Sequence, residues 1–243
     1  MRAEVHENLM TEKETSISVV VPILESGVAL RALKSDLCAA LAGVDYEVIF
    51  VDDASREPTR LLLVEIIARW PEARRISCPT RLGQHAATWL GLCAASRSVV
   101  VTLDDDGQFA AADIKTLLAA LTDDAMIVYG KPRRSAHPIA RKTLSVVTRT
   151  ASRFLPNSLV AKRVRFVSSF RCMHRALIAR AVRDGGPPHF VDSLLLRHAR
   201  TVASIAVDHH PSRVGRSRYH MRDLAQHVAR ILMQNWQKAG GRG

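Results

Sequence analysis

Apolar and polar positions in the first 131 residues alternate between two patterns. Continuous apolar and β-branched runs, such as SISVVVPIL at 16–24, are typical of strands buried on both faces of a sheet. Between these runs, apolar residues recur three or four positions apart, which is the spacing of an amphipathic helix. The runs predict strands at 16–24, 46–55, 73–80, 98–106 and 125–131. The spaced segments predict helices at 28–41, 58–70, 83–96 and 112–124.

This regular alternation indicates the fold class. Strands and helices that alternate at such short intervals form right-handed strand–helix–strand units, which build a mostly parallel sheet flanked by helices. We therefore predict an α/β fold with a Rossmann-like central sheet. Ligands of such sheets bind beyond the carboxyl ends of the strands. Two acidic clusters, Asp52–Asp53 and Asp104–Asp106, stand at such ends.

The pattern changes after Lys131. The segments 139–155 and 219–236 each have helical spacing of apolar residues and several basic residues on the remaining positions. Basic amphipathic helices can lie in a membrane interface, and they can equally pack their apolar side on a domain core. The presence of two such helices in one basic region favours a surface role.

Charge is distributed unevenly along the 243 residues. Residues 1–130 contain 12 Lys/Arg and 19 Asp/Glu, a net charge of −7, whereas residues 131–243 contain 23 and 4, a net charge of +19. The first part suits metal ions or sugar hydroxyls, and the second suits phosphates, nucleic acid or an anionic membrane surface. Nucleic acid is disfavoured as a partner, because acidic strand ends repel a polyanion and only 5% of the residues are aromatic.

Cysteines and apolar runs predict the location of the protein. The four cysteines are scattered and form no C-x-x-C pair, which indicates reduced thiols. The N-terminus lacks the apolar core of a signal peptide, and no window approaches 18 consecutive apolar residues. We therefore expect a cytoplasmic protein without a spanning helix, with peripheral contact at the inner face of the membrane through its basic half.

The stretch VVVTLDDDGQF at 99–109 places three consecutive carboxylates after a predicted strand. Adjacent carboxylates repel one another and cannot all be buried without partners. A hard divalent cation, Mg²⁺ or Mn²⁺, binds such oxygen ligands and also neutralises the diphosphate of a sugar nucleotide. The D-x-D pattern alone is a weak signal, since acidic strand ends are common.

Four stretches that occur in a fixed order make the pattern specific: SVVVPILES, YEVIFVDDAS, RLGQHAATWLGL and VVVTLDDDGQ. Together they resemble glycosyltransferase family 2, an inverting family with the GT-A fold. The G-Q-H-A-A helix start, Gln108, CMHRA at 172–176 and VGRSRYHMRDL at 214–224 are most similar to its polyprenyl-phosphate glycosyltransferases. The resemblance covers roughly residues 16–230.

This resemblance implies a donor site for a sugar carried by UDP, GDP or dTDP. Its donor-binding residues would be Pro22, Leu24, Glu25, Asp52, Asp53, Arg81, Gly83, Asp104 and Asp105. Asp104 would face the ribose or the sugar, and Asp106 with Gln108 would ligate Mg²⁺ or Mn²⁺. Asp105 stands where the family usually has a small residue, and its side chain is expected to point to solvent. The family also usually has Asn-Glu where this chain has Glu25-Ser26.

The resemblance further implies that arginines hold the acceptor phosphate. Arg141, which would also take part in catalysis, lies in ARKT, and Arg216, Ser217 and Arg218 lie in GRSRY. Two features depart from the polyprenyl-phosphate enzymes. Ser169, in VSSFRCM, replaces their usual aspartate, and the chain shows no helices that would anchor it in a membrane.

These features predict an enzyme, a metal-dependent inverting glycosyltransferase with a polyprenyl-phosphate-like acceptor. An ionised phosphate needs no general base, whereas a hydroxyl does. If the acceptor is a hydroxyl of a soluble glycoside or metabolite, Asp192 in HFVDSLL is the candidate base; a loop or helix-capping aspartate is the other interpretation. A nucleotide- or nucleic-acid-binding protein without transfer activity is the third alternative.

One domain would carry this activity. We predict it at 16–236, with a nucleotide-sugar-binding half at 16–131 and an acceptor-binding half at 132–236. Residues 1–15 and 237–243 would be flexible ends.

Overall fold

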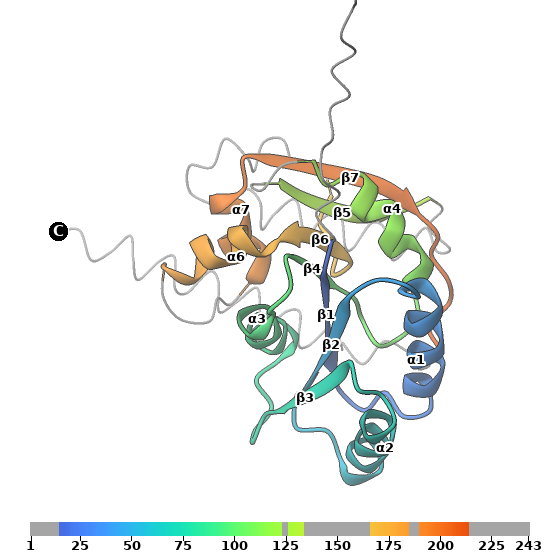
Figure 1. Ribbon diagram of the computed structural model, residues 1–243. Helices are drawn as coiled ribbons and strands as arrows, with labels where there is room; N and C mark the ends of the chain where they lie inside the picture. Colours follow the sequence, from blue (N-terminus) through green and yellow to red (C-terminus); the bar gives the residue numbers. More distant parts are fainter. Residues whose placement is uncertain (1–14, 123–125, 134–165, 185–189, 214–243) are drawn as a thin grey trace, which may run out of the picture.

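The computed structural model describes residues 15–122, 126–133, 166–184 and 190–213, which form a seven-stranded sheet between two layers of helices (Figure 1). The strands are β1 (Ile17–Ile23), β2 (Tyr46–Asp52), β3 (Ala73–Ser77), β4 (Val99–Thr102), β5 (Met126–Pro132), β6 (Arg171–His174) and β7 (Thr201–Val207). The helices are α1 (Ala29–Ala40), α2 (Glu57–Ala68), α3 (Gln84–Ala94), the 3₁₀ helix η1 (Ala111–Asp113), α4 (Ile114–Ala119), α6 (Arg175–Val182) and α7 (Val191–His198).

The sheet has the order β3-β2-β1-β4-β6-β5-β7. Strand β1 pairs in parallel with β2 and β4, β2 with β3, and β5 with β7. Only β6 runs antiparallel to its neighbours β4 and β5. The predicted α/β fold with a mostly parallel central sheet is confirmed.

Each face of the sheet has its own apolar core. Side chains of a strand alternate between the two faces, so Val19 and Val21 of β1 face one core and Val20 faces the other. Helices α1, α2 and α4 cover the first face, and α3, α6 and α7 cover the second (Figure 1). Helix α3 lies very close to the sheet. A Cβ atom at Gly91 would overlap the side chain of Val20 on β1, so only glycine fits at this position.

Several predicted elements are shorter in the structure than in the sequence pattern, and two of them differ most at their ends. The strand predicted at 98–106 ends at Thr102, and the helix predicted at 112–124 ends at Ala119. Strand β4 lies between β1 and β6, so carboxylates that continued it would enter the sheet interior. The chain therefore turns away from the sheet before Asp104.

The region after Lys131 is described only in part. Strands β6 and β7 and helices α6 and α7 were not predicted, and they complete the sheet and its second helical layer. The basic helices predicted at 139–155 and 219–236 lie outside the described residues, as do the flexible tail predicted at 237–243 and residues 1–14 of the flexible end predicted at 1–15. In the described part of the chain, no helix is both long enough and apolar enough to span a bilayer.

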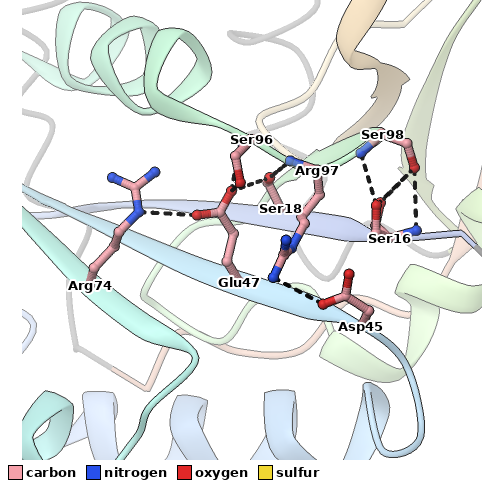
Figure 2. A network of polar contacts seen from close by, with 8 residues as sticks. All are labelled: Ser16, Ser18, Asp45, Glu47, Arg74, Ser96, Arg97 and Ser98. Carbon is pink, nitrogen blue, oxygen red and sulfur yellow. Dashed lines mark hydrogen bonds and ion pairs between the residues drawn. The ribbon is translucent and has the colours of Figure 1, made fainter.

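A polar cluster ties the strands together at their amino ends, at the opposite end from Asp104–Asp106, whose turn at residues 104–108 we call the acidic turn (Figure 2). The carboxylate of Glu47 on β2 accepts hydrogen bonds from Ser18 Oγ (2.7 Å), Ser96 N (2.7 Å) and Arg74 Nε (3.0 Å). These partners come from β1, β3 and the turn that leads into β4. Glu47 therefore links three strands and the start of a fourth.

We expect Glu47→Gln to lower the free energy of unfolding by about 2 kcal/mol at neutral pH. Burial alone would raise the pKa of Glu47, but hydrogen bonds from Ser18, Ser96 and Arg74 outweigh burial and lower the pKa from 4.5 to about 2. Because the folded pKa lies below the unfolded one, this stabilisation is present above pH 4.5 and is lost as the pH falls towards 2. Urea unfolding at several pH values should show a difference between variant and wild type that shrinks on acidification.

Glu65→Gln is the matched control for this experiment. Glu65 pairs with Arg31 at 2.9 Å on an exposed surface, so its loss should change the unfolding free energy by less than about 0.5 kcal/mol. A Glu47→Gln variant with the same pH dependence as wild type would contradict the assigned role of Glu47.

Candidate active site

Three loops meet where the parallel strands β1, β2 and β4 end. They are residues 24–27, 53–56 and 104–108, and we call them together the carboxyl edge. Glu25 N donates a hydrogen bond to Ser55 Oγ (3.3 Å), and Ser26 Oγ donates one to Asp105. The two acidic clusters singled out in the sequence therefore belong to one site.

Asp104 is held from two sides. Its Oδ1 accepts a hydrogen bond from Gln84 Nε2 at the start of α3 (2.6 Å), and its Oδ2 accepts one from Ser169 Oγ. Burial raises the pKa of Asp104 to about 6, although the hydrogen bond from Ser169 acts in the opposite direction. Ser169 therefore does not leave a gap where the family usually has an aspartate, because its hydroxyl binds the first carboxylate of the D-x-D motif.

Asp105 does not point to solvent, which corrects the expectation for its side chain. Its Oδ2 accepts the hydrogen bond from Ser26 Oγ and lies 3.5 Å from Leu24 N. Ser26 is only 3% exposed. The central aspartate of the motif thus contacts the loop that follows β1.

Asp106 and Gln108 form a tight turn. Asp106 Oδ1 accepts a hydrogen bond from Gln108 N (2.9 Å), and Gly107 between them has φ of +69°. Residues 208–213, which we call the strap, run along this turn. Arg213 N donates to Asp106 O (2.8 Å), and His210 N donates to Gln108 O (2.8 Å).

The Asp106 turn fits a hard divalent cation. Among the described residues, Asp106 forms no ion pair with a lysine or arginine, and burial raises its pKa. Its charge is therefore poorly compensated by the protein, and carboxylate and amide oxygens are suitable ligands for Mg²⁺ or Mn²⁺. Within the described part of the chain, no three Asp, Glu, His or Cys side chains already converge as ligands, so diphosphate oxygens and water would complete the coordination.

Asp53 and Asp52 organise the loops beside this turn. Asp53 is 3% exposed, and its two carboxylate oxygens accept hydrogen bonds from Leu82 N (2.6 Å) and Gly83 N (2.9 Å). Asp52 Oδ1 accepts one from Ser55 N (2.9 Å), which closes the turn after β2. Both aspartates therefore shape loops of the carboxyl edge.

The other residues expected to bind a donor also lie around this edge. Pro22 is buried in β1 opposite Val51, whereas Arg81 is exposed in the loop before α3. Glu25 Oε1 accepts a hydrogen bond from Arg56 N (2.7 Å). Arg141, Arg216, Ser217 and Arg218, expected to hold an acceptor phosphate, lie outside the described residues.

Two residues of these loops have a left-handed backbone conformation that is unusual for residues other than glycine. Glu25 has φ of +57° and Ala54 has φ of +59°. Such conformations cost of order 1–3 kcal/mol each and persist only where the surroundings hold them. They occur frequently at ligand sites, and here they stand at the ends of β1 and β2.

Asp192 lies in the first turn of α7, with its side chain turned inward. The side chain is 4% exposed, and Oδ1 accepts hydrogen bonds from Tyr129 Oη (2.7 Å) and from Arg171. Arg171 on β6 is equally buried and also interacts electrostatically with Asp104. This geometry favours a structural role for Asp192, and its role as a general base stays a prediction.

Sequence reasoning missed two residues of this region, Arg171 and His209. In the sequence, Arg171 is a single charged residue next to the apolar residues of VSSFRCM. This isolated charge is the signal that could have indicated its role. His209 lies in the strap beside Asp106, near enough for their charges to interact, and its ring contacts Phe109 with 5.1 Å between centroids. Its only sequence signal is the histidine pair after Asp208.

Comparisons with known proteins agree with this geometry. The sequence model of the family described as "Glycosyl transferase family 2" matches residues 18–184. The chain is 28% identical over 222 residues to undecaprenyl-phosphate 4-deoxy-4-formamido-L-arabinose transferase from Yersinia enterocolitica, covering 88% of this chain and 65% of that protein. For the enzyme of the same name from Klebsiella pneumoniae, the values are 25% over 210 residues, 84% and 62%. The chain thus spans less than two thirds of the length of these relatives.

Solved structures show the same fold. Glucosyl-3-phosphoglycerate synthase from Mycobacterium tuberculosis, in complex with Mn²⁺, UDP and glucosyl-3-phosphoglycerate, has a TM-score of 0.58 at 19% identity and covers 91% of this chain and 80% of its own. A mannosyltransferase from Pyrobaculum calidifontis, in complex with GDP-Man and Mn²⁺, has a TM-score of 0.58 at 20% identity, with 93% and 64% covered. These matches confirm the predicted GT-A fold.

Proposed function

The chain belongs to glycosyltransferase family 2, and on that premise we propose that it transfers a sugar from a nucleotide diphosphate to the phosphate of a polyprenyl-phosphate-like lipid, with inversion and with a divalent metal. The observation that carries this proposal is the Asp106 turn at the carboxyl edge, which is closed by the hydrogen bond from Gln108 N to Asp106 Oδ1 (2.9 Å) and held by the strap. Family membership makes the protein a glycosyltransferase, which confirms the expected enzyme and leaves the non-catalytic alternative without support.

The donor would lie across the carboxyl edge. Residues 24–27 and 53–56 would surround the base and ribose, and Asp104 would face the ribose or the sugar. Asp106 and Gln108 would hold Mg²⁺ or Mn²⁺, which, when bound, neutralises the charge on the departing nucleoside diphosphate. The solved enzymes from Mycobacterium tuberculosis and Pyrobaculum calidifontis, whose titles name Mn²⁺ with UDP and with GDP-Man, support a metal and a nucleotide donor here.

A phosphate acceptor suits the carboxylates of this site. An acceptor phosphate is ionised near neutral pH and attacks without a general base, whereas a hydroxyl must lose a proton. Asp104 is bound by Gln84 and Ser169, and Asp192 is bound by Arg171 and Tyr129. Both carboxylates are thus already engaged by protein groups, which favours an acceptor that needs no base.

The curated relatives support a lipid acceptor, because their names specify undecaprenyl phosphate. We assign 16–131 to donor binding and 132–236 to the acceptor, with Arg141, Arg216, Ser217 and Arg218 as phosphate ligands. The net charge of +19 after residue 130 favours this assignment and peripheral contact with an anionic membrane.

The proposal predicts turnover that depends on metal and on a lipid phosphate. The full chain, with Mn²⁺ and UDP-, GDP- and dTDP-sugars, should release the nucleoside diphosphate with one donor class when a short polyprenyl phosphate is present. Without Mn²⁺, or with the matching polyprenol that lacks the phosphate, release should fall at least about a hundredfold. In the first case the charge of the leaving diphosphate is not neutralised, and in the second the phosphate nucleophile is missing. Chromatography of the nucleotide products measures this.

Two results would contradict the proposal. Turnover with soluble hydroxyl acceptors but not with the lipid phosphate would favour the alternative with Asp192 as base. If no sugar nucleotide stabilised the protein against thermal unfolding in a metal-dependent way, the assignment of the donor site itself would be wrong.

A further inference from the structure

The three aspartates of the acidic turn bind three different parts of the chain. Asp104 binds Gln84 and Ser169, and Asp106 binds the backbone of its own turn and of the strap. Asp105 points the other way, to Ser26 and Leu24 in the loop after β1. Among the contacts described for these three aspartates, those of Asp105 alone connect the acidic turn with the loop after β1.

The loop after β1 needs such a connection. Glu25, between the two residues that Asp105 contacts, has φ of +57°, a conformation that its neighbours must maintain. On one side, Glu25 is held by Ser55 Oγ and by Arg56 N. On the other side, Ser26 is buried with its hydroxyl on Asp105. Without the Asp105 contact, Ser26 keeps the backbone hydrogen bond from Ala29 N to its carbonyl (3.3 Å) but loses its side-chain partner.

Resting on the donor site proposed above, we propose that Asp105 is a positioning residue: it holds the Leu24–Ser26 loop against the acidic turn and thereby sets the affinity for the sugar nucleotide. Asp105 acts through Ser26, and the Asp106 turn does not depend on it. Its loss should affect donor binding much more than the transfer step.

Asp105→Ala should raise the donor KM about tenfold and change kcat less than about threefold. Ser26→Ala should have the same effect, and the double variant should be no worse than either single one, because each removes the same contact. Asp105→Asn keeps a carbonyl oxygen that accepts from Ser26 Oγ, so its donor KM should stay within about threefold of wild type.

The exchange of the two side chains is the most direct test. The double variant Ser26→Asp with Asp105→Ser again places a hydroxyl opposite a carboxylate, but the carboxylate now comes from position 26 and the hydroxyl from position 105. It should recover most of the donor affinity that either single change loses. Asp45→Ala, which removes an aspartate from an exposed ion pair with Arg97 at the opposite edge of the sheet, is the matched control and should leave the donor KM unchanged.

Amide hydrogen exchange of the free protein tests the loop independently of any donor. Asp105→Ala should speed exchange at residues 24–27 and leave the β2 residues unchanged. Unaltered exchange there, an unaltered donor KM, or additive effects in the double variant would overturn the proposal. If wild type binds no sugar nucleotide, the proposed function fails, and faster loop exchange in the variant still shows that Asp105 anchors the loop.

Discussion

Replacement of Asp106 with alanine is expected to lower kcat/KM for the sugar nucleotide about a thousandfold. We assign Asp106 as the carboxylate ligand of the metal, and a metal that neutralises a leaving diphosphate lowers the barrier by several kcal/mol; about 4 kcal/mol corresponds to this factor. Titration with Mn²⁺, followed by turnover and by thermal shift, measures the loss. Thermal unfolding without metal should be measured alongside, because the variant also loses the hydrogen bond from Gln108 N.

Asp113→Asn is the matched control for Asp106→Ala. Asp113 follows the same turn at the end of η1, and its Oδ2 accepts a hydrogen bond from Asp208 N (3.1 Å), which an asparagine oxygen can also accept. The control should keep the activity and metal response of wild type. An Asp106→Ala variant with Mn²⁺-dependent turnover within tenfold of wild type would refute the metal assignment.

Asp192→Asn is expected to lower the free energy of unfolding by about 3–4 kcal/mol. Removal of one partner of a buried ion pair leaves the other charge uncompensated, and this typically costs 3–5 kcal/mol. Arg171 and Asp192 have side chains only 3% and 4% exposed, and the Arg171 Nε already lacks a hydrogen-bond partner. Urea denaturation measures the loss, and activity should then be expressed per folded molecule.

Two further variants separate a structural role of Asp192 from a chemical one. Asp184→Asn removes a carboxylate whose partner His198 lies 2.9 Å away at the surface, and should cost less than about 1 kcal/mol. Combined Tyr129→Phe, Arg171→Met and Asp192→Leu replaces the buried polar groups with apolar ones and should recover more than half of the stability. An Asp192→Asn protein that is stable yet inactive would instead identify a general base.

The sequence pattern predicts the first five strands, most of them from apolar runs, although β3 (ARRIS) is short and contains two arginines. It extends β4 too far, since a pattern of apolar residues does not show where carboxylates force the chain out of a sheet. The edge strand β7, with residues that are mostly exposed or half-buried, lacks such a run. The short β6 contains Arg171, which interrupts its apolar pattern.

The acidic strand ends predict the place of the site but not the contacts of each carboxylate. Asp105 and Ser26 are 79 residues apart, and Asp104 and Ser169 are 65 residues apart. Asp192 drew attention because acids are scarce after Lys131, and its ion pair with Arg171 depends on how β6 and α7 meet. Such contacts follow from tertiary packing, which local patterns do not encode.

The strap has a consequence for synthesis on the ribosome. All three loops of the carboxyl edge belong to the first 108 residues, but Asp106 and Gln108 are bound through their carbonyl groups by Arg213 and His210. At about 5–20 residues per second, the roughly hundred intervening residues take about 5–20 s to emerge. During that interval the backbone carbonyls of Asp106 and Gln108 lack the donors of the strap, so the turn at residues 104–108 is completed only late in translation.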